Sequence, residues 1–150
     1  MDNKIDLPRK IEILKAQHCF SQLMPSELET LASLLKEVNL SKGRTIVTEG
    51  ESVDSVYFII KGTADVQHVR LKDGAPQIEL VATLKEGETI GLNESGFYSL
   101  TGLRTATVVA SSDMLLLRLS VAAFHGFALA YPHVNEVMRA NARSFLGLKS

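Results

Sequence analysis

Residues 42–62 read KGRTIVTEGESVDSVYFIIKG, and this stretch shows the pattern that recurs through the middle of the chain. Two short runs, 44–48 and 56–60, are bounded by Lys-Gly and Glu-Gly pairs that favour turns. The run at 56–60 is apolar or aromatic at every position, which predicts a strand buried on both faces. Short strands separated by turns at steps of about 8–12 residues are typical of an antiparallel sandwich or barrel.

A hairpin is predicted next along the chain. Asp73-Gly74 lies between two alternating runs, 64–71 and 77–84, and this dipeptide favours a tight turn between antiparallel strands. The second run places Ile78, Leu80, Ala82 and Leu84 on one face. Two further strands, 105–110 and 114–119, are predicted on either side of the turn Ser111-Ser112-Asp113.

Helical patterns lie at both ends of the chain. Asp6 followed by Pro8 predicts one helix start, and Pro25 suits the first position of a second helix. Ser120 is predicted to cap a helix that Pro132 ends, and a final helix follows toward residue 146. The sequence therefore predicts one α+β domain over 1–150, with N-terminal helices at 7–38, an antiparallel β-roll or jelly-roll barrel of about eight strands at 39–119, and two C-terminal helices at 120–148.

The composition excludes several classes of function. The net charge of −1 argues against a nucleic-acid-binding surface, and the chain leaves no room for a helix-turn-helix domain after the last helix. No apolar run approaches the roughly 20 residues of a membrane span, and the charged N-terminus lacks the apolar core of a signal peptide. A lone cysteine, Cys19, fits a reducing, cytoplasmic setting and a small apolar role near a helix end.

No catalytic pattern is apparent either. The four histidines are scattered and none forms the His-x-His pair that metal-binding barrel enzymes use. No serine lies in a nucleophile elbow, and Cys19 has no evident base. We therefore expect a chain that is not an enzyme and that holds no metal and no cofactor.

The segment from 87 to 110, GETIGLNESGFYSLTGLRTATVVA, carries the candidate site. A single arginine, Arg104, opens an apolar strand after a loop rich in glycine and asparagine. Such residues allow backbone N–H groups to turn toward a ligand, and a guanidinium offers a fixed fork of donors to a phosphate. The segment therefore predicts a phosphate-binding loop. The permissive positions are Gly91, Asn93, Gly96 and Gly102.

The order of these stretches resembles the cyclic-nucleotide-binding domain superfamily over nearly the whole chain. FSQLMPSELETLASLLKEV at 20–38 is similar to the N-terminal helical entry of that family, and 42–62 is similar to its first barrel half. GETIG at 87–91 and LRTATVVA at 103–110 are similar to the phosphate-binding cassette and the strand that leaves it. The resemblance implies a ligand, cAMP or cGMP, held by that cassette.

The resemblance also implies roles for single residues. Arg104 is expected to pair with the cyclic phosphate, and Gly91 to offer its backbone N–H. The family's next residue, a glutamate that takes the ribose 2′-hydroxyl, is Leu92 here. The usual proline before the arginine is Leu103, and the interval of 104 − 91 = 13 positions is longer than the family usually shows. The expected binding residues are Val81 and Ala82 for the base, with Ile90, Gly91, Leu92, Asn93, Glu94, Arg104, Thr105 and Ala106 in and after the cassette.

Several alternatives stay open from the sequence. Glu94 is either a substitute for the missing glutamate or a solvated loop carboxylate, and Arg104 faces either an anionic ligand or Glu94 itself. Thr105 permits cGMP without selecting it over cAMP. The last helix is a lid, a dimer contact or a helix packed on its own barrel.

We therefore expect a regulatory module that binds cAMP or cGMP and signals through its C-terminal helix to an effector protein or to its own subunit. In the second case the same helix would form a homodimer. The alternative is a degenerate domain that binds no nucleotide, or a different ligand, and serves docking or dimerisation. A third reading is a fragment of a larger protein.

Overall fold

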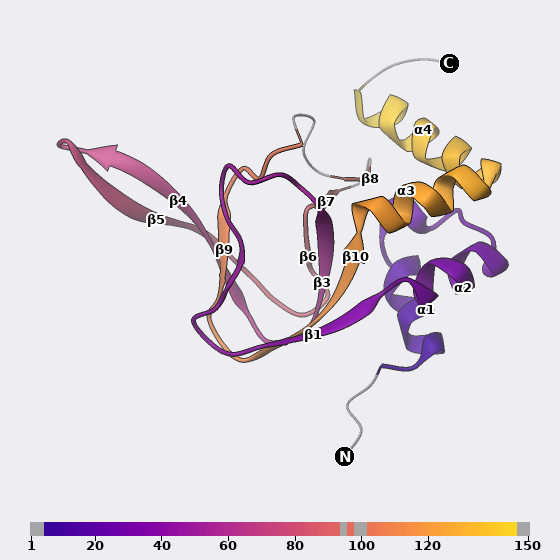
Figure 1. Cartoon of the computed structure of the whole chain (residues 1–150), viewed down its shortest axis with the longest axis horizontal. Helices are drawn as coiled ribbons and strands as arrows, with labels where there is room; N and C mark the ends of the chain where they lie inside the picture. Colours follow the sequence, from indigo (N-terminus) through magenta and orange to yellow (C-terminus); the bar gives the residue numbers. More distant parts are fainter. Residues whose placement is uncertain (1–4, 94–95, 98–101, 147–150) are drawn as a thin grey trace.

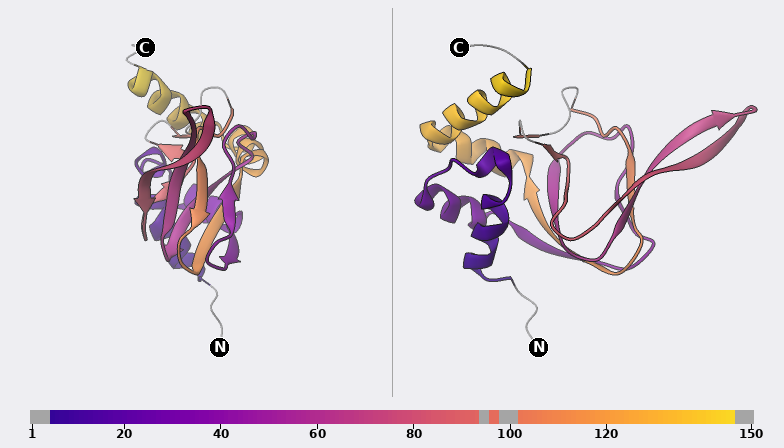
Figure 2. Two further views of the ribbon diagram at one scale, coloured as in Figure 1. Left: turned by 90° about the vertical axis from the view of Figure 1, so that its left-hand side faces the viewer. Right: turned by 180° about the vertical axis from the view of Figure 1, so that it is seen from behind.

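The structure of the protein is a computed structural model that describes residues 5–93, 96–97 and 102–146. Helices come first, a β-roll occupies the middle of the chain, and two helices follow (Figure 1). The N-terminal and C-terminal helices lie together at one end of the roll, as the front and rear views agree (Figure 2).

Two sheets of four strands form the roll, and all their pairings are antiparallel. One sheet has the order β1-β10-β3-β6 and the other β2-β9-β4-β5, while β7 and β8 form a separate two-stranded ribbon. The strands are β1 (Lys36–Leu40), β2 (Thr45–Val47), β3 (Ser55–Lys61), β4 (Ala64–Lys72), β5 (Ala75–Leu84), β6 (Thr89–Ile90), β7 (Leu92–Asn93), β8 (Gly96–Phe97), β9 (Thr107–Ala110) and β10 (Met114–Ser120).

The predicted fold class is confirmed, since the chain is α+β with an antiparallel roll of eight strands. Within the described ranges no pairing joins the two four-stranded sheets, so the roll is not a closed barrel. Strands β1, β6, β7 and β8 are absent from the prediction. Strands β6, β7 and β8 have two residues each, too few for an alternation to stand out, and most of β1 falls within the range predicted as helical, 7–38.

The N-terminal helices are α1 (Leu7–Lys15), the 3₁₀ turn η1 (His18–Phe20) and α2 (Pro25–Ser33). Asp6 caps α1 by accepting a hydrogen bond of 3.0 Å from the Arg9 N–H, as the sequence predicts. The second helix is shorter than predicted: it ends at Ser33, and residues 36–38 begin β1. Pairing of β1 with β10 takes those residues into the sheet.

Strand β3 separates two apolar cores, which confirms the predicted burial of both its faces. Val56, Phe58 and Ile60 pack with the helices, whereas Ile59 faces the interior of the roll. Alternate side chains of one strand project to opposite faces, so an unbroken apolar run can serve both cores.

The predicted hairpin is β4–β5, and its turn is the predicted Asp73-Gly74 pair. Both turn residues have positive φ, 53° and 78°, which is the geometry of the tightest antiparallel turns. The hairpin projects far beyond the roll (Figures 1 and 2). Its pairing shifts register between Val66 and Gln67, so Val81 is an extra residue on β5.

The C-terminal helices are α3 (Val121–Ala130) and α4 (Pro132–Leu146). Ser120 caps α3, since its hydroxyl accepts a hydrogen bond of 3.2 Å from the Ala123 N–H. In α4, Val134 and Val137 are buried in the same core as α1 and α2. This part of α4 therefore packs on its own chain, which is the plainest of the predicted roles for the helix.

Candidate functional site

The backbone on either side of Arg104 is held against the segment that precedes β3. The Arg104 N–H donates to the Glu51 carbonyl at 2.7 Å, and the Arg104 carbonyl accepts from the Gly50 N–H at 2.9 Å. Two residues before Arg104, the Gly102 carbonyl accepts a hydrogen bond of 2.7 Å from the Val53 N–H. These bonds fix where the arginine side chain enters the roll.

The Arg104 side chain is buried, and the residue is only 7% exposed. Its Nη2 donates to the Ser55 carbonyl at 2.7 Å and lies 3.6 Å from Asp54 Oδ1. The Ser55 hydroxyl donates to the same Asp54 carboxylate at 2.8 Å, which holds that carboxylate beside the guanidinium. Asp54 itself is largely exposed, so it screens the buried cation only in part.

The other terminal nitrogen, Arg104 Nη1, has no hydrogen-bond partner among the described residues, although it is buried. Burial lowers the pKa of Arg104 from its ordinary value, and the nearby Tyr57, Asp54 and Glu51 oppose that shift. An arginine keeps its proton at neutral pH even when buried, because its ordinary pKa is so high. The site therefore presents a fixed positive charge with an unused donor.

The backbone of Gly91 lies directly against Arg104 Nη1. A Cβ atom built on Gly91 would lie 2.9 Å from Arg104 Nη1, closer than real Cβ contacts come. Its φ of +86° also lies in the left-handed region that favours glycine. Only glycine therefore satisfies both the backbone conformation and the close approach of the guanidinium at this position.

A cavity of about 280 Å³ opens beside Arg104. Its walls are mostly apolar, its cation is Arg104, and no carboxylate stands among the described residues that line it. A cavity with apolar walls and one fixed polar anchor is the ordinary form of a small-molecule site. The lining residues are Val47, Val53, Val66, Leu84, Thr89, Ile90, Gly91, Leu103, Arg104, Thr105, Ala106 and Val108.

Five of the ten predicted site residues line this cavity: Ile90, Gly91, Arg104, Thr105 and Ala106. Val81 and Ala82, expected to contact the base, are exposed on β5 and are not among the lining residues. The wall on that hairpin comes from Val66 and Leu84 instead, which lie nearer the roll. Leu92 and Asn93 form β7, and Glu94 lies outside the described residues.

Thr105 and Ala106 also differ from the prediction in their backbone. They were expected to begin a strand, but β9 begins at Thr107. The Thr107 hydroxyl accepts a hydrogen bond of 3.0 Å from the Glu49 N–H, which anchors the start of the strand. The irregular residues before it are the ones that line the cavity.

The sequence did not identify Asp54 and Ser55 as partners of Arg104. They follow a turn and precede an apolar strand, and only the pairing of 50–53 with 102–104 brings them together with the arginine. A second cavity, of about 290 Å³, lies beside Asp54. Its lining includes Arg104, Asp54, Glu51 and Tyr57. Arg104 thus lies between a largely apolar cavity and a more polar one.

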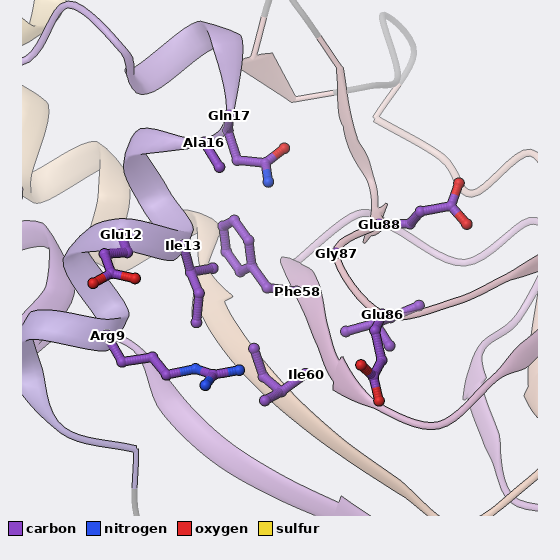
Figure 3. Close-up of a pocket in the computed structure, with 11 residues that line it drawn as sticks. Arg9, Glu12, Ile13, Ala16, Gln17, Phe58, Ile60, Glu86, Gly87 and Glu88 are labelled. Atoms are coloured by element: carbon purple, nitrogen blue, oxygen red, sulfur yellow. The ribbon is translucent and has the colours of Figure 1, made fainter.

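A further cavity of about 460 Å³ lies away from Arg104, between α1 and β3 (Figure 3). Phe58 and Ile60 form its floor, and Arg9, Glu12 and Glu86 stand at its rim. These charged side chains are exposed. This cavity therefore lacks the buried, unsatisfied donor that marks the cavity beside Arg104.

The part of the chain that the structure describes holds neither a metal-ligand cluster nor a membrane-spanning helix. No group of three or more histidine, cysteine, aspartate or glutamate side chains there is placed to hold a metal ion. No helix there has both the length and the apolar character needed to cross a membrane.

Cys19 lies in η1 and is buried in the core shared by the helices. Burial raises the pKa of its thiol to about 12. The thiolate is the nucleophilic form, so the thiol is unreactive in the folded chain at neutral pH.

Comparison with known proteins places this geometry in a family. A curated relative, the Pycsar effector protein PaPycTIR of Pseudomonas aeruginosa, is 34% identical over 110 residues, which cover 71% of this chain and 32% of the relative. The chain thus spans about a third of the length of that relative.

Solved structures share the fold. The N-terminal domain of a transcriptional regulator from Streptomyces coelicolor A3(2) superposes with a TM-score of 0.73 at 23% identity, covering 89% of this chain and 90% of that one. The regulatory domain of Toxoplasma gondii PKA, solved with cAMP, has a TM-score of 0.66 at 21% identity, covering 83% and 46%. The family model described as the cyclic nucleotide-binding domain matches residues 37–131, which run from within β1 to the end of α3. The chain therefore belongs to the cyclic nucleotide-binding domain family.

Proposed function

We propose that this chain is a non-catalytic regulatory module that binds a 3′,5′-cyclic nucleotide, cAMP or cGMP, in the cavity beside Arg104. The observation that carries the proposal is Arg104 Nη1, a buried cationic donor with no partner among the described residues. Burying an unsatisfied charged donor costs several kcal/mol, and a bound anion offsets that cost. A cyclic phosphate carries one negative charge and two free oxygens, so it matches one guanidinium.

The walls of the cavity suit the rest of the nucleotide. Val66 and Leu84 come from the hairpin and Ile90 from β6, so a base finds apolar surface on several sides. Thr89 and Thr105 add hydroxyl groups to the lining. A single charged anchor with apolar walls orients a ligand whose phosphate lies at one end and whose base lies at the other.

Among the parts of the nucleotide, the ribose has the fewest polar partners in the described lining of the cavity. The residue after Gly91 is Leu92, and no described carboxylate lines the cavity, so the ribose 2′-hydroxyl has no ionised acceptor there. A hydrogen bond to a charged group contributes about 1.5–3 kcal/mol. We therefore expect a 2′-deoxy cyclic nucleotide to bind within about threefold of the ribonucleotide, unless Glu94 supplies the acceptor.

Binding is proposed to act on the C-terminal helices. Helix α3 follows directly from β10, and α4 packs with α1 and α2. Phosphate binding between Gly91 and Arg104 would draw the cassette inward and shift this helical end. Ligand can do so only through different affinities for the two positions of the helices. The output, on this proposal, is an effector protein or a second subunit.

Titration calorimetry of the full chain with the four 3′,5′-cyclic mononucleotides (adenine, guanine, cytosine and uracil) tests the proposal. We expect cAMP or cGMP to bind in the micromolar range, and Arg104→Ala to weaken that binding by about 10²–10⁴-fold, because a charge-assisted bidentate contact is lost. Arg44→Ala is the matched control, since Arg44 is exposed and does not line the cavity. Its affinity should equal that of the unmodified chain.

The second candidate is a degenerate domain that binds no nucleotide and serves docking. Leu92 favours it, because the carboxylate that the family places after this glycine is absent. Asp54 also gives the guanidinium a partner within the chain. If none of the four nucleotides binds below about 1 mM, or if Arg104→Ala binds as tightly as the unmodified chain, the second candidate replaces the first.

A further inference from the structure

The β4–β5 hairpin has two unlike faces. Directly opposed residues of an antiparallel pair project to the same side, and the register pairs Val69 with Ile78 and Leu71 with Pro76. Gln67 pairs with Leu80 on that side as well. We call Val69, Leu71, Pro76, Ile78 and Leu80 the apolar face of the hairpin.

The opposite face is polar. The register pairs His68 with Glu79 and Arg70 with Gln77, while Lys72 pairs with Ala75 near the turn. The His68 and Arg70 side chains contact each other there. We call His68, Arg70, Lys72, Gln77 and Glu79 the polar face of the hairpin.

No described part of the chain covers the apolar face. Leu71 is 79% exposed, Ile78 70% and Leu80 60%, and Val69 is also more than half exposed. The hairpin projects away from the roll, so no helix or sheet of the described structure lies over it (Figures 1 and 2). The strands alternate as half-buried strands do, and the described residues supply nothing to bury them.

From this we infer that the apolar face of the β4–β5 hairpin is a dimer interface, on which the same face of a second copy of this chain packs around a twofold axis. The apolar face carries no charged group, so it offers nothing to recognise a charged partner or an anionic lipid surface. Its chemistry is complementary to itself, which is what an isologous interface requires. The cations of the hairpin, Arg70 and Lys72, lie on the other side and would stay in water.

The area is consistent with a weak dimer. The exposed apolar side chains amount to about 500 Å² on one hairpin. Two such faces in contact would remove about 1,000 Å² from water, which is near the lower limit for a specific interface. A dissociation constant in the micromolar range is therefore expected, rather than a permanent dimer.

This surface is distinct from the α4 contact predicted from the sequence. In the described part of α4, Val134 and Val137 are buried against the chain's own core and Met138 packs on it. Those side chains are not available to a partner, whereas the hairpin is. The inference does not depend on nucleotide binding.

Sedimentation velocity of the full chain from about 1 to 100 µM tests the inference. We expect a concentration-dependent monomer–dimer equilibrium that Ile78→Ser/Leu80→Ser weakens at least tenfold. Gln77→Ser/Glu79→Ser changes two neighbouring exposed residues on the same strand, one position away, and should dimerise like the unmodified chain. A chain that stays monomeric throughout, forms only larger assemblies, or is unaffected by the apolar-face change overturns the inference.

A cross-linking pair gives a second readout that does not depend on the fold of the serine variants. Ile78→Cys should form a covalent dimer quickly under mild oxidation, and Gln77→Cys, which faces the other way, should not. Cys19 is buried with a raised pKa, so it does not compete. Equal rates of cross-linking at the two positions would place the contact elsewhere.

Discussion

At the scale of single residues, Arg104 is buried with an unsatisfied donor, which costs free energy of folding. A purely structural role would not require that cost. The guanidinium is buried, one nitrogen is satisfied by the Ser55 carbonyl, and the other is unsatisfied among the described residues. Replacing a buried charge by an apolar group of similar length is often neutral or stabilising. Stability lost at such a position points to function.

Arg104→Met tests this account in the absence of ligand. We expect the free energy of unfolding to stay equal or to rise by about 1 kcal/mol, because methionine fills the site without a buried charge. Urea denaturation measures it, and the same variant should lose nucleotide binding. A fall of more than about 2 kcal/mol would mean that the guanidinium is a structural element of the roll.

The buried thiol of Cys19 predicts that the free energy of unfolding falls as the pH rises above 9. Its folded pKa of about 12 lies above the reference value of 9.0, so the thiol favours the folded state below pH 9 and that contribution is lost as pH rises toward 12. Between pH 8 and 10 the unmodified chain should lose about 1 kcal/mol more unfolding free energy than Cys19→Ala. Denaturant titrations of both proteins at the two pH values measure this difference. Parallel pH dependence would show that the thiol titrates normally in the fold.

At the scale of the elements, a buried carboxylate joins the two helical groups. Glu27 in α2 is 4% exposed; it accepts from the Met24 N–H at 2.7 Å and contacts His133 Nδ1 of α4 at 2.8 Å. The Thr30 and Tyr131 hydroxyls approach to 3.4 Å beside it. The N-terminal helices and α4 are therefore packed together, with polar contacts as well as the shared apolar core between them.

Glu27→Ala should lower the unfolding free energy by about 2 kcal/mol, because the Met24 N–H loses its acceptor and His133 loses its partner. Glu29→Ala is the matched control, since Glu29 is exposed in the same helix, and it should change stability by less than about 0.5 kcal/mol. Thermal and urea denaturation measure both. Equal effects of the two changes would mean that the contact between α2 and α4 contributes nothing.

At the scale of the whole molecule, the sequence predicts the architecture well because its signals are local. The Asp73-Gly74 turn, the Ser120 and Asp6 caps and the apolar run of β3 each act within a few residues, and all are confirmed. Strands β1, β6, β7 and β8 escaped prediction, because pairing with a neighbouring strand rather than local pattern makes them strands.

The candidate site is predictable only in its central part. Gly91 and Arg104 stand out in the sequence, but their partners Asp54 and Ser55 depend on a pairing between segments about 50 residues apart. Val81 and Ala82, the expected base contacts, are not among the residues that line the cavity. Val81 is the extra residue at the register shift of β5, and strand alternation alone does not reveal such a shift.

The most direct test of the central claim, that Arg104 binds an anionic phosphate, is a double-mutant cycle between the residue and the ligand's charge. Calorimetry would compare the tightest-binding cyclic nucleotide with its neutral phosphate methyl ester, on the unmodified chain and on Arg104→Ala. We predict a coupling energy of about 2–4 kcal/mol, since the ester should lose affinity only where the guanidinium is present. A coupling near zero, with both ligands weakened equally by the substitution, would contradict the claim.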